Sequence, residues 1–245
     1  MPQLSPEIWL LLLGGALLAS TLGAVTGFGG AALLLPLLVV AVGVRDAVPL
    51  LTVVQLVGNG SRAWLNRRAV DLRVVGWFSL GGIPLAILGA TAFAHAPRDP
   101  LTRLLGMILL GIVAWRRLGP ARTWRPALRD FAAIGAVSSL ISALVGSVGP
   151  LMAPLFLAYG LVKGAYIGTE ASATVVMHVT KLVVYGQAAV LTPEAVTTGV
   201  VLAPAMILGS WLGKRLVDRL PERTFTLVIE GTMTAAGLLF LVRGA

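Results

Sequence analysis

Long apolar runs separated by short polar segments recur along the whole chain. A helix needs about 20 mainly apolar residues to cross a bilayer core, so these runs predict membrane-spanning helices. The first run has no basic segment before it and is expected to be a mature span, not a signal peptide. The fold class is therefore expected to be an all-α integral membrane protein. We place its segments at 8–27, 31–43, 47–66, 74–93, 101–118, 131–148, 150–160, 165–190, 193–213 and 224–242.

Two of these runs, 31–43 and 150–160, are short for a membrane crossing, and each follows a glycine-rich break. The first break is GFGG at 27–30, and the second is GSVGP at 146–150. A single break is also typical of a helix kink or of close helix packing. A matched pair favours the interrupted helices that build transporter sites. We therefore expect broken or re-entrant short helices after both breaks.

The two halves of the chain resemble each other. Residues 36–38 (PLL) match 154–156 (PLF) at an offset of 118, and 83–84 (IP) match 203–204 (AP) at an offset of 120. The sequence predicts an N-terminal repeat at 1–118, a cytoplasmic linker at 119–130 and a C-terminal repeat at 131–245. About five segments per repeat is an odd number, so the halves are expected to be inverted-topology repeats, as in many secondary transporters.

Composition and charge narrow the class of protein. Apolar residues make up 57% of the chain and charged residues 12%, which excludes an ordinary soluble enzyme. The net charge of +9 does not indicate nucleic-acid binding, because apolar runs separate the basic residues. Thirteen of the 19 basic residues fall on one side of the predicted spans and four on the other. The positive-inside rule then makes the thirteen-cation side cytoplasmic and places both termini on the outer side of the membrane. The absence of cysteine excludes disulfides and thiolate catalysis.

The two remaining cations, Arg62 and Lys181, lie within apolar runs at an offset of 119 residues. Helical spacing places each on a polar stripe. One stripe runs Gln55, Asn59, Arg62, Asn66, and the other runs Thr174, His178, Lys181, Tyr185. A charge that faces hydrocarbon costs about 2.5–3.5 kcal/mol, so both stripes are expected to face the bundle interior. The alternative is that both side chains snorkel to the headgroups.

Two inward cations surrounded by neutral hydrogen-bonding groups indicate an anion site. Backbone N–H groups at the breaks, and the helices that begin there, would add positive potential. The predicted substrate-binding residues are Gly27, Gly29, Gly30, Gln55, Asn59, Arg62, Gly146, Gly149, Thr174, His178 and Lys181.

Other polar residues in the apolar runs have different expected roles. Glu170 and Glu230 are candidates to carry a coupled proton, although Glu170 also fits a first-turn acid at a helix N-terminus. Ser138, Ser139 and Ser142 are expected to pack helices. No organic cofactor or metal is implied, and coupling to H⁺ or to Na⁺ stays open.

The GFGG break, its short apolar run and the degenerate second copy resemble the TauE/SafE family of membrane permeases. The helix end at 64–71 (WLNRRAVD) is similar to that family's signature of an aromatic, basic residues and a Val-Asp pair. The resemblance covers nearly the whole chain and implies a transporter of small sulfur-containing anions, such as sulfite or organosulfonates, in a bacterial plasma membrane. The second break has fewer glycines than the family pattern, and Glu170 stands where the family has a small polar residue. These departures indicate a changed substrate.

The sequence thus favours a non-enzymatic permease for sulfite, an organosulfonate or a related organic acid, working by alternating access. Its expected partners are the small anion and the lipid bilayer, without nucleic acid, and homo-oligomerisation stays open. One alternative is an integral-membrane enzyme acting on a lipid-like substrate, which needs a carboxylate pair or a metal cluster. Another is a non-transporting membrane assembly subunit with an exposed face of small residues.

Overall fold

The computed structural model of the protein describes residues 5–27, 29–96, 125–146, 148–219 and 221. These residues form eight α-helices and one short 3-10 helix, and they contain no strand. The all-helical expectation is confirmed for them, and eight of the ten predicted runs correspond to helices. Runs 101–118 and 224–242, and half of the predicted linker, lie outside the described residues. The elements are α1 (Pro6–Thr26), α2 (Gly29–Val42), α3 (Val44–Leu65), η1 (Arg67–Ala69), α4 (Leu72–His95), α6 (Asp130–Val145), α7 (Gly149–Ala158), α8 (Lys163–Gln187) and α9 (Pro193–Arg219).

The burial pattern reverses that of a soluble protein. Apolar side chains such as Leu10, Val40 and Leu80 are exposed, whereas Gln55 and Asn59 are buried. Exposed apolar surface on this scale indicates a lipid environment. Among the described helices, α1, α4 and α9 are long and apolar enough to cross a membrane. Helices α3 and α8 carry the polar stripes, and their polar faces point inward.

Both predicted glycine breaks interrupt a helix in the same way. Gly27 ends α1 with φ 83° and ψ −17°, and Gly146 ends α6 with φ 85° and ψ −22°. The N–H of each donates at 2.8 Å to a carbonyl four residues earlier, Gly23 O for α1 and Ser142 O for α6. Glycine adopts this left-handed conformation without a Cβ clash, which explains why both helices end there. With 14 and 10 residues, α2 and α7 rise about 21 Å and 15 Å, less than the roughly 30 Å bilayer core.

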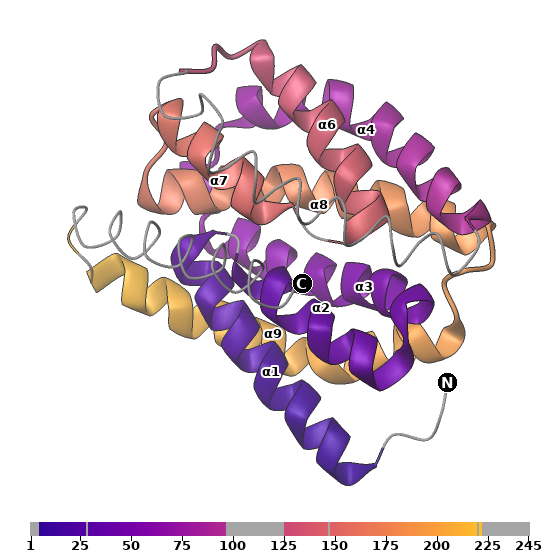
Figure 1. The fold of residues 1–245 in the computed structure, drawn as a ribbon. Coiled ribbons are helices and arrows are strands. Elements are labelled where there is room, and N and C mark those ends of the chain that lie inside the picture. The colour runs from indigo at the N-terminus through magenta and orange to yellow at the C-terminus, as the bar shows by residue number, and fades with distance from the viewer. Residues whose placement is uncertain (1–4, 28, 97–124, 147, 220, 222–245) are drawn as a thin grey trace, which may run out of the picture.

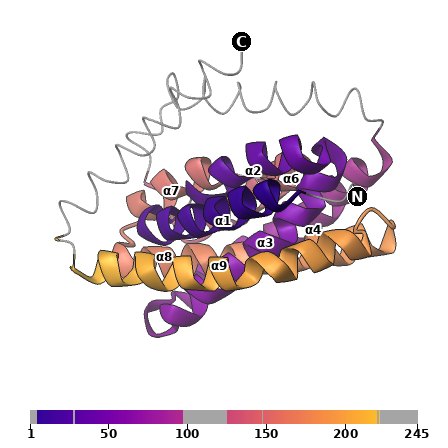
Figure 2. The ribbon, with the colours of Figure 1, turned by 90° about the horizontal axis from the view of Figure 1, so that it is seen from below.

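The order of elements recurs along the chain. A helix that ends at a glycine break, a short helix, a polar-striped helix and a long helix appear as α1–α4 and again as α6–α9, although α6 is shorter than α1. Helix α1 packs on α9 and α6 packs on α4, while α3 and α8 contact each other in the middle (Figures 1 and 2). Both large apolar clusters draw residues from both halves, so the halves share a core.

Close approach of α4 and α6 gives a first testable prediction. A Cβ at Gly81 would overlap the backbone carbonyl of Ala132, whereas a Cβ at Gly76, on the same helix, would meet nothing within 4 Å. We expect Gly81→Ala to destabilise the protein by about 1–3 kcal/mol, because the helices must separate. Gly76→Ala is expected to hold or raise stability, since alanine favours helix more than glycine. Thermal unfolding in detergent checks this, and equal melting temperatures for the two variants would contradict it.

Candidate functional site

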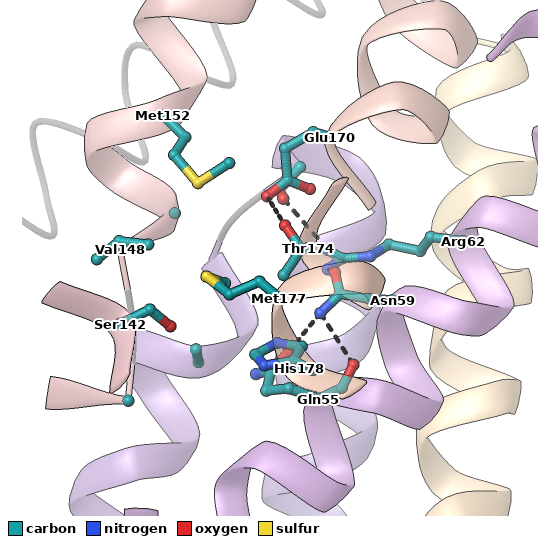
Figure 3. A pocket seen from close by; sticks show the side chains of 14 residues that line it. Gln55, Asn59, Arg62, Ser142, Val148, Met152, Glu170, Thr174, Met177 and His178 are labelled. Carbon is teal, nitrogen blue, oxygen red and sulfur yellow. Dashed lines mark hydrogen bonds between the residues drawn. The ribbon is translucent and has the colours of Figure 1, made fainter. Parts of the chain in front are cut away.

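A small polar cavity lies where α3, α8 and the two glycine breaks meet (Figure 3). Its volume is about 30 Å³, room for about one water molecule. Helices α3 and α8 supply most of its polar wall, and α2, α6 and α7 supply the rest. The lining residues are Gly27, Ala31, Gln55, Asn59, Arg62, Ser142, Gly146, Val148, Gly149, Met152, Glu170, Thr174, Met177 and His178.

The polar stripe of α3 forms a connected set of side chains that holds Arg62. Asn59 Nδ2 donates to the carbonyl of Gln55 at 2.9 Å, and Asn59 Oδ1 accepts from Arg62 Nη2. Arg62 Nη1 donates to the carbonyl of Gly27 at 3.4 Å, which links α3 to the first break. The spacing of these residues on one helical face makes this arrangement possible. The guanidinium is thereby fixed at the cavity wall.

Helix α8 contributes Glu170, Thr174 and His178 from the opposite wall. Thr174 Oγ1 donates to Glu170 Oε1 at 3.1 Å. Glu170 and Arg62 both point toward the cavity (Figure 3), but no direct ion pair joins them in the described part of the chain. The interpretation of Glu170 as a first-turn acid was wrong. Helix α8 begins at Lys163, so Glu170 lies about two turns inside the helix and is buried.

Four buried polar atoms of the cavity residues have no hydrogen-bond partner among the residues the structure describes. Three are nitrogens, Gln55 Nε2, Arg62 Nε and His178 Nδ1, and the fourth is Glu170 Oε2. Buried polar groups are normally paired, so this cluster calls for an explanation. The amide and guanidinium nitrogens are donors, and the imidazole Nδ1 is a donor in one tautomer. A group rich in acceptor oxygens would satisfy all three nitrogens.

Lys181 occupies a different position from Arg62. Its Nζ donates to Ser142 Oγ at 2.9 Å and to Ser142 O at 3.4 Å, in the last turn of α6. Lys181 does not line the cavity, and Ser142 connects it to the wall. Arg62 meets the end of α1 through Gly27 in the same manner. Arg62 and Lys181, at matching positions in the two halves, therefore each contact the carbonyl end of a helix that stops at a glycine break. The helix dipole is negative at that end.

Neither cation faces lipid. Arg62 is 6% exposed and Lys181 is 0% exposed, so the snorkelling alternative does not describe either side chain. Burial of a cation is costly unless polar groups compensate for it, and here backbone carbonyls and side-chain oxygens do so. Spacing and charge predicted that both polar stripes face the interior of the bundle, and the structure buries the cation of each stripe.

The structure brings most of the predicted site residues together. Eight line the cavity: Gly27, Gln55, Asn59, Arg62, Gly146, Gly149, Thr174 and His178. Gly30 and Lys181 are not in its wall, and the surroundings of Gly29 lie outside what the structure describes. Gly30 instead allows close packing on α1, where an added Cβ would lie 2.6 Å from Ala19 O. Glu230 lies outside the described residues.

Sequence reasoning missed five lining residues, Ala31, Ser142, Val148, Met152 and Met177. Ser142, expected to pack helices, bonds Lys181 of α8 and also lines the cavity. Its position four residues before Gly146, at the carbonyl that caps α6, was an available signal. Met177 shares a helical face with Thr174 and could have been found by spacing. The apolar residues from α2 and α7 carried no such signal.

Apolar helices with inward polar stripes around a donor-lined cavity define a polytopic membrane protein with an internal polar site. The sequence model of a family described as Sulfite exporter TauE/SafE matches residues 12–240, nearly the whole chain. The chain therefore belongs to this family of exporter-type membrane transporters, and the resemblance noted in the sequence is confirmed. It is a transporter family and not an enzyme family, which removes the alternative of a lipid-modifying enzyme. No curated protein and no solved structure matches the chain.

Proposed function

We propose that the protein is a secondary transporter that binds sulfite or a closely related small oxyanion in the cavity between α3 and α8. The observation that carries this proposal is the cluster of unpaired buried nitrogens on Gln55, Arg62 and His178. Sulfonate and sulfite oxygens accept hydrogen bonds and carry negative charge, so they match both the donors and the guanidinium.

The charge of the site supports an anionic substrate. Arg62 brings a buried guanidinium, which stays protonated in proteins, to the cavity wall. Coulomb interactions are strong where water is excluded, so this charge favours an anion over a neutral or cationic solute. The cavity has room for about one water molecule in this conformation, so it must widen to admit sulfite, and it needs to widen less for a compact oxyanion than for an aromatic sulfonate.

The matched halves support alternating access. The same element order, the same left-handed glycine at each break and the reciprocal α1–α9 and α4–α6 contacts fit two inverted repeats, 1–118 and 131–245, joined at 119–130. The cavity at the junction of α3 and α8 corresponds to the inter-repeat site of such transporters. Short helices α2 and α7 line it, so their movement would open it to either side. In this proposal the more basic face is cytoplasmic and both termini lie outside.

Glu170 is the proposed coupling residue. Its carboxylate faces the same cavity as Arg62, and its Oε2 has no partner among the described residues. A carboxylate there competes with the substrate for the guanidinium, and protonation removes that competition. Anion and proton would therefore bind together. Glu230, the second candidate, plays no part in this argument because it lies outside the described residues.

A flux measurement in proteoliposomes tests the proposed function. We expect saturable sulfite uptake well above protein-free liposomes, stimulated by a pH gradient that supplies protons on the side of the sulfite. Taurine, sulfoacetate, an aromatic sulfonate and acetate serve as competitors, and the compact oxyanions are expected to compete best. Failure of every anion in this panel to be transported or to compete would contradict the proposal.

The same assay separates coupling from binding through Glu170→Gln. We expect this variant to retain sulfite exchange but to lose its stimulation by the pH gradient, because the amide cannot take up a proton. Glu194→Gln, at the exposed start of α9, removes the same charge outside the cavity and is expected to behave like wild type. An unchanged pH response in Glu170→Gln would show that the proton is carried elsewhere.

A further inference from the structure

An apolar crevice lies on the outer surface between α3 and α9, apart from the polar cavity. Trp64 and Leu65 line it from α3, and Ile207, Leu208 and Trp211 line it from α9. The crevice measures about 590 Å³, within the range of about 300–1,000 Å³ typical of ligand pockets. Helices α3 and α9 pack side by side (Figure 2), and residues of both helices line the crevice.

An arginine side chain stacks on each of the two tryptophans that line the crevice. The Arg67 guanidinium lies 4.4 Å from the Trp64 ring centroid, and the Arg215 guanidinium lies 3.6 Å from that of Trp211. Trp64 is 67% exposed and Trp211 is 38% exposed, so both stacked pairs lie on the surface. Stacking on an aromatic face positions a guanidinium while leaving its N–H groups available.

Neither arginine is neutralised by an acid in the part of the chain that the structure describes. The ion pair present there joins Lys214 to Asp218 at 3.0 Å, and it leaves Arg67 and Arg215 unpaired with carboxylates. Arg67 donates one hydrogen bond, to the carbonyl of Trp64. The basic border of the crevice therefore keeps an excess of positive charge.

We propose that this crevice binds an anionic phospholipid, with an acyl chain between α3 and α9 and the phosphate at Arg67 and Arg215. An apolar furrow on a membrane helix pair suits an acyl chain, and tryptophans are enriched at the level of the headgroups. Arginine binds phosphate through two parallel N–H donors. A free phosphate would gain nothing from the apolar lining, and a zwitterionic lipid would gain less from the two unpaired cations. The inference uses the membrane location of the chain and does not depend on which anion it transports.

Lipid binding by the detergent-purified full chain tests this inference. We expect native mass spectrometry and thermal-shift titration to show phosphatidylglycerol binding about tenfold tighter than phosphatidylcholine. The double variant Arg67→Gln/Arg215→Gln is expected to lose this preference. The matched control Arg68→Gln/Arg219→Gln removes two exposed arginines from the same helix ends, neither stacked on a crevice tryptophan, and is expected to keep it.

Several results would overturn the inference. Equal loss of the preference in both double variants would assign it to diffuse charge and not to the crevice. Inorganic phosphate that stabilises the protein as well as phosphatidylglycerol does would remove the role of the acyl chain. A dimer that dissociates on Leu208→Glu, with lipid binding unchanged, would assign the crevice to a second copy of the chain.

Discussion

Replacing Arg62 by glutamine is expected to weaken sulfite binding and saturable sulfite transport strongly while the protein still folds. The substitution removes the cavity's cationic donor, its bond to Gly27 O and its bond to Asn59 Oδ1. Hydrogen bonds to charged groups contribute about 1.5–3 kcal/mol each, so losing one to the substrate lowers affinity by about 10- to 100-fold. Sulfite binding by thermal shift and flux in proteoliposomes measures both effects.

Two controls make the Arg62 result interpretable. Arg73→Gln removes the same charge from an exposed position at the start of α4 and is expected to leave transport unchanged. The double variant Arg62→Gln/Glu170→Gln removes one cationic and one acidic side chain together. It therefore distinguishes the loss of anion recognition by Arg62 from the effect of leaving the Glu170 carboxylate buried without a nearby cation. Wild-type affinity for sulfite in Arg62→Gln would refute the anion site.

Gly27→Ala is expected to be the most disruptive single change at the breaks. Gly27 has φ 83°, where an L side chain is strained by about 1–2 kcal/mol. An added Cβ would also overlap the ring of Tyr166, whose hydroxyl donates at 2.9 Å to Thr26 O. Overpacking adds about 1–3 kcal/mol, so we expect a clearly lower melting temperature together with loss of transport.

Gly146→Ala is the matched control for that change. Gly146 has nearly the same backbone conformation, φ 85° and ψ −22° against φ 83° and ψ −17° at Gly27. Its added Cβ would meet the flexible tip of Leu51 at 3.1 Å instead of an aromatic ring, so this variant carries mainly the backbone strain. We expect its melting temperature to fall less than that of Gly27→Ala. Thermal unfolding of the two variants checks this order, and equal losses of stability would show that crowding by Tyr166 is unimportant.

The sequence predicted the helices and stripes because each rests on short-range information. Helical spacing puts Gln55, Asn59 and Arg62 on one face whatever the helix packs against, and a charge within an apolar run must turn inward. Glycine at a break likewise acts through its own backbone. These features required no knowledge of neighbouring helices.

Features that depend on packing between helices were not predictable in this way. The partner of Lys181 is Ser142, 39 residues earlier, and only the rotation of α6 against α8 brings them together. Glu170 was open to misinterpretation because its role depends on where α8 begins. The crevice between α3 and α9 joins residues about 140 positions apart in sequence, and no local pattern indicates it.

The bond from Arg62 to Gly27 has a thermodynamic consequence for transport. The terminal nitrogens of Arg62 are already engaged by Gly27 O and Asn59 Oδ1. An anion that draws these nitrogens away also breaks the bond to the carbonyl end of α1. Anion binding and the formation of the Arg62–Gly27 bond are therefore coupled equilibria. Such linkage is reciprocal: whatever tightens the α1 end weakens anion affinity by the same factor, and occupancy loosens it. Binding energy is thereby available at the end of α1.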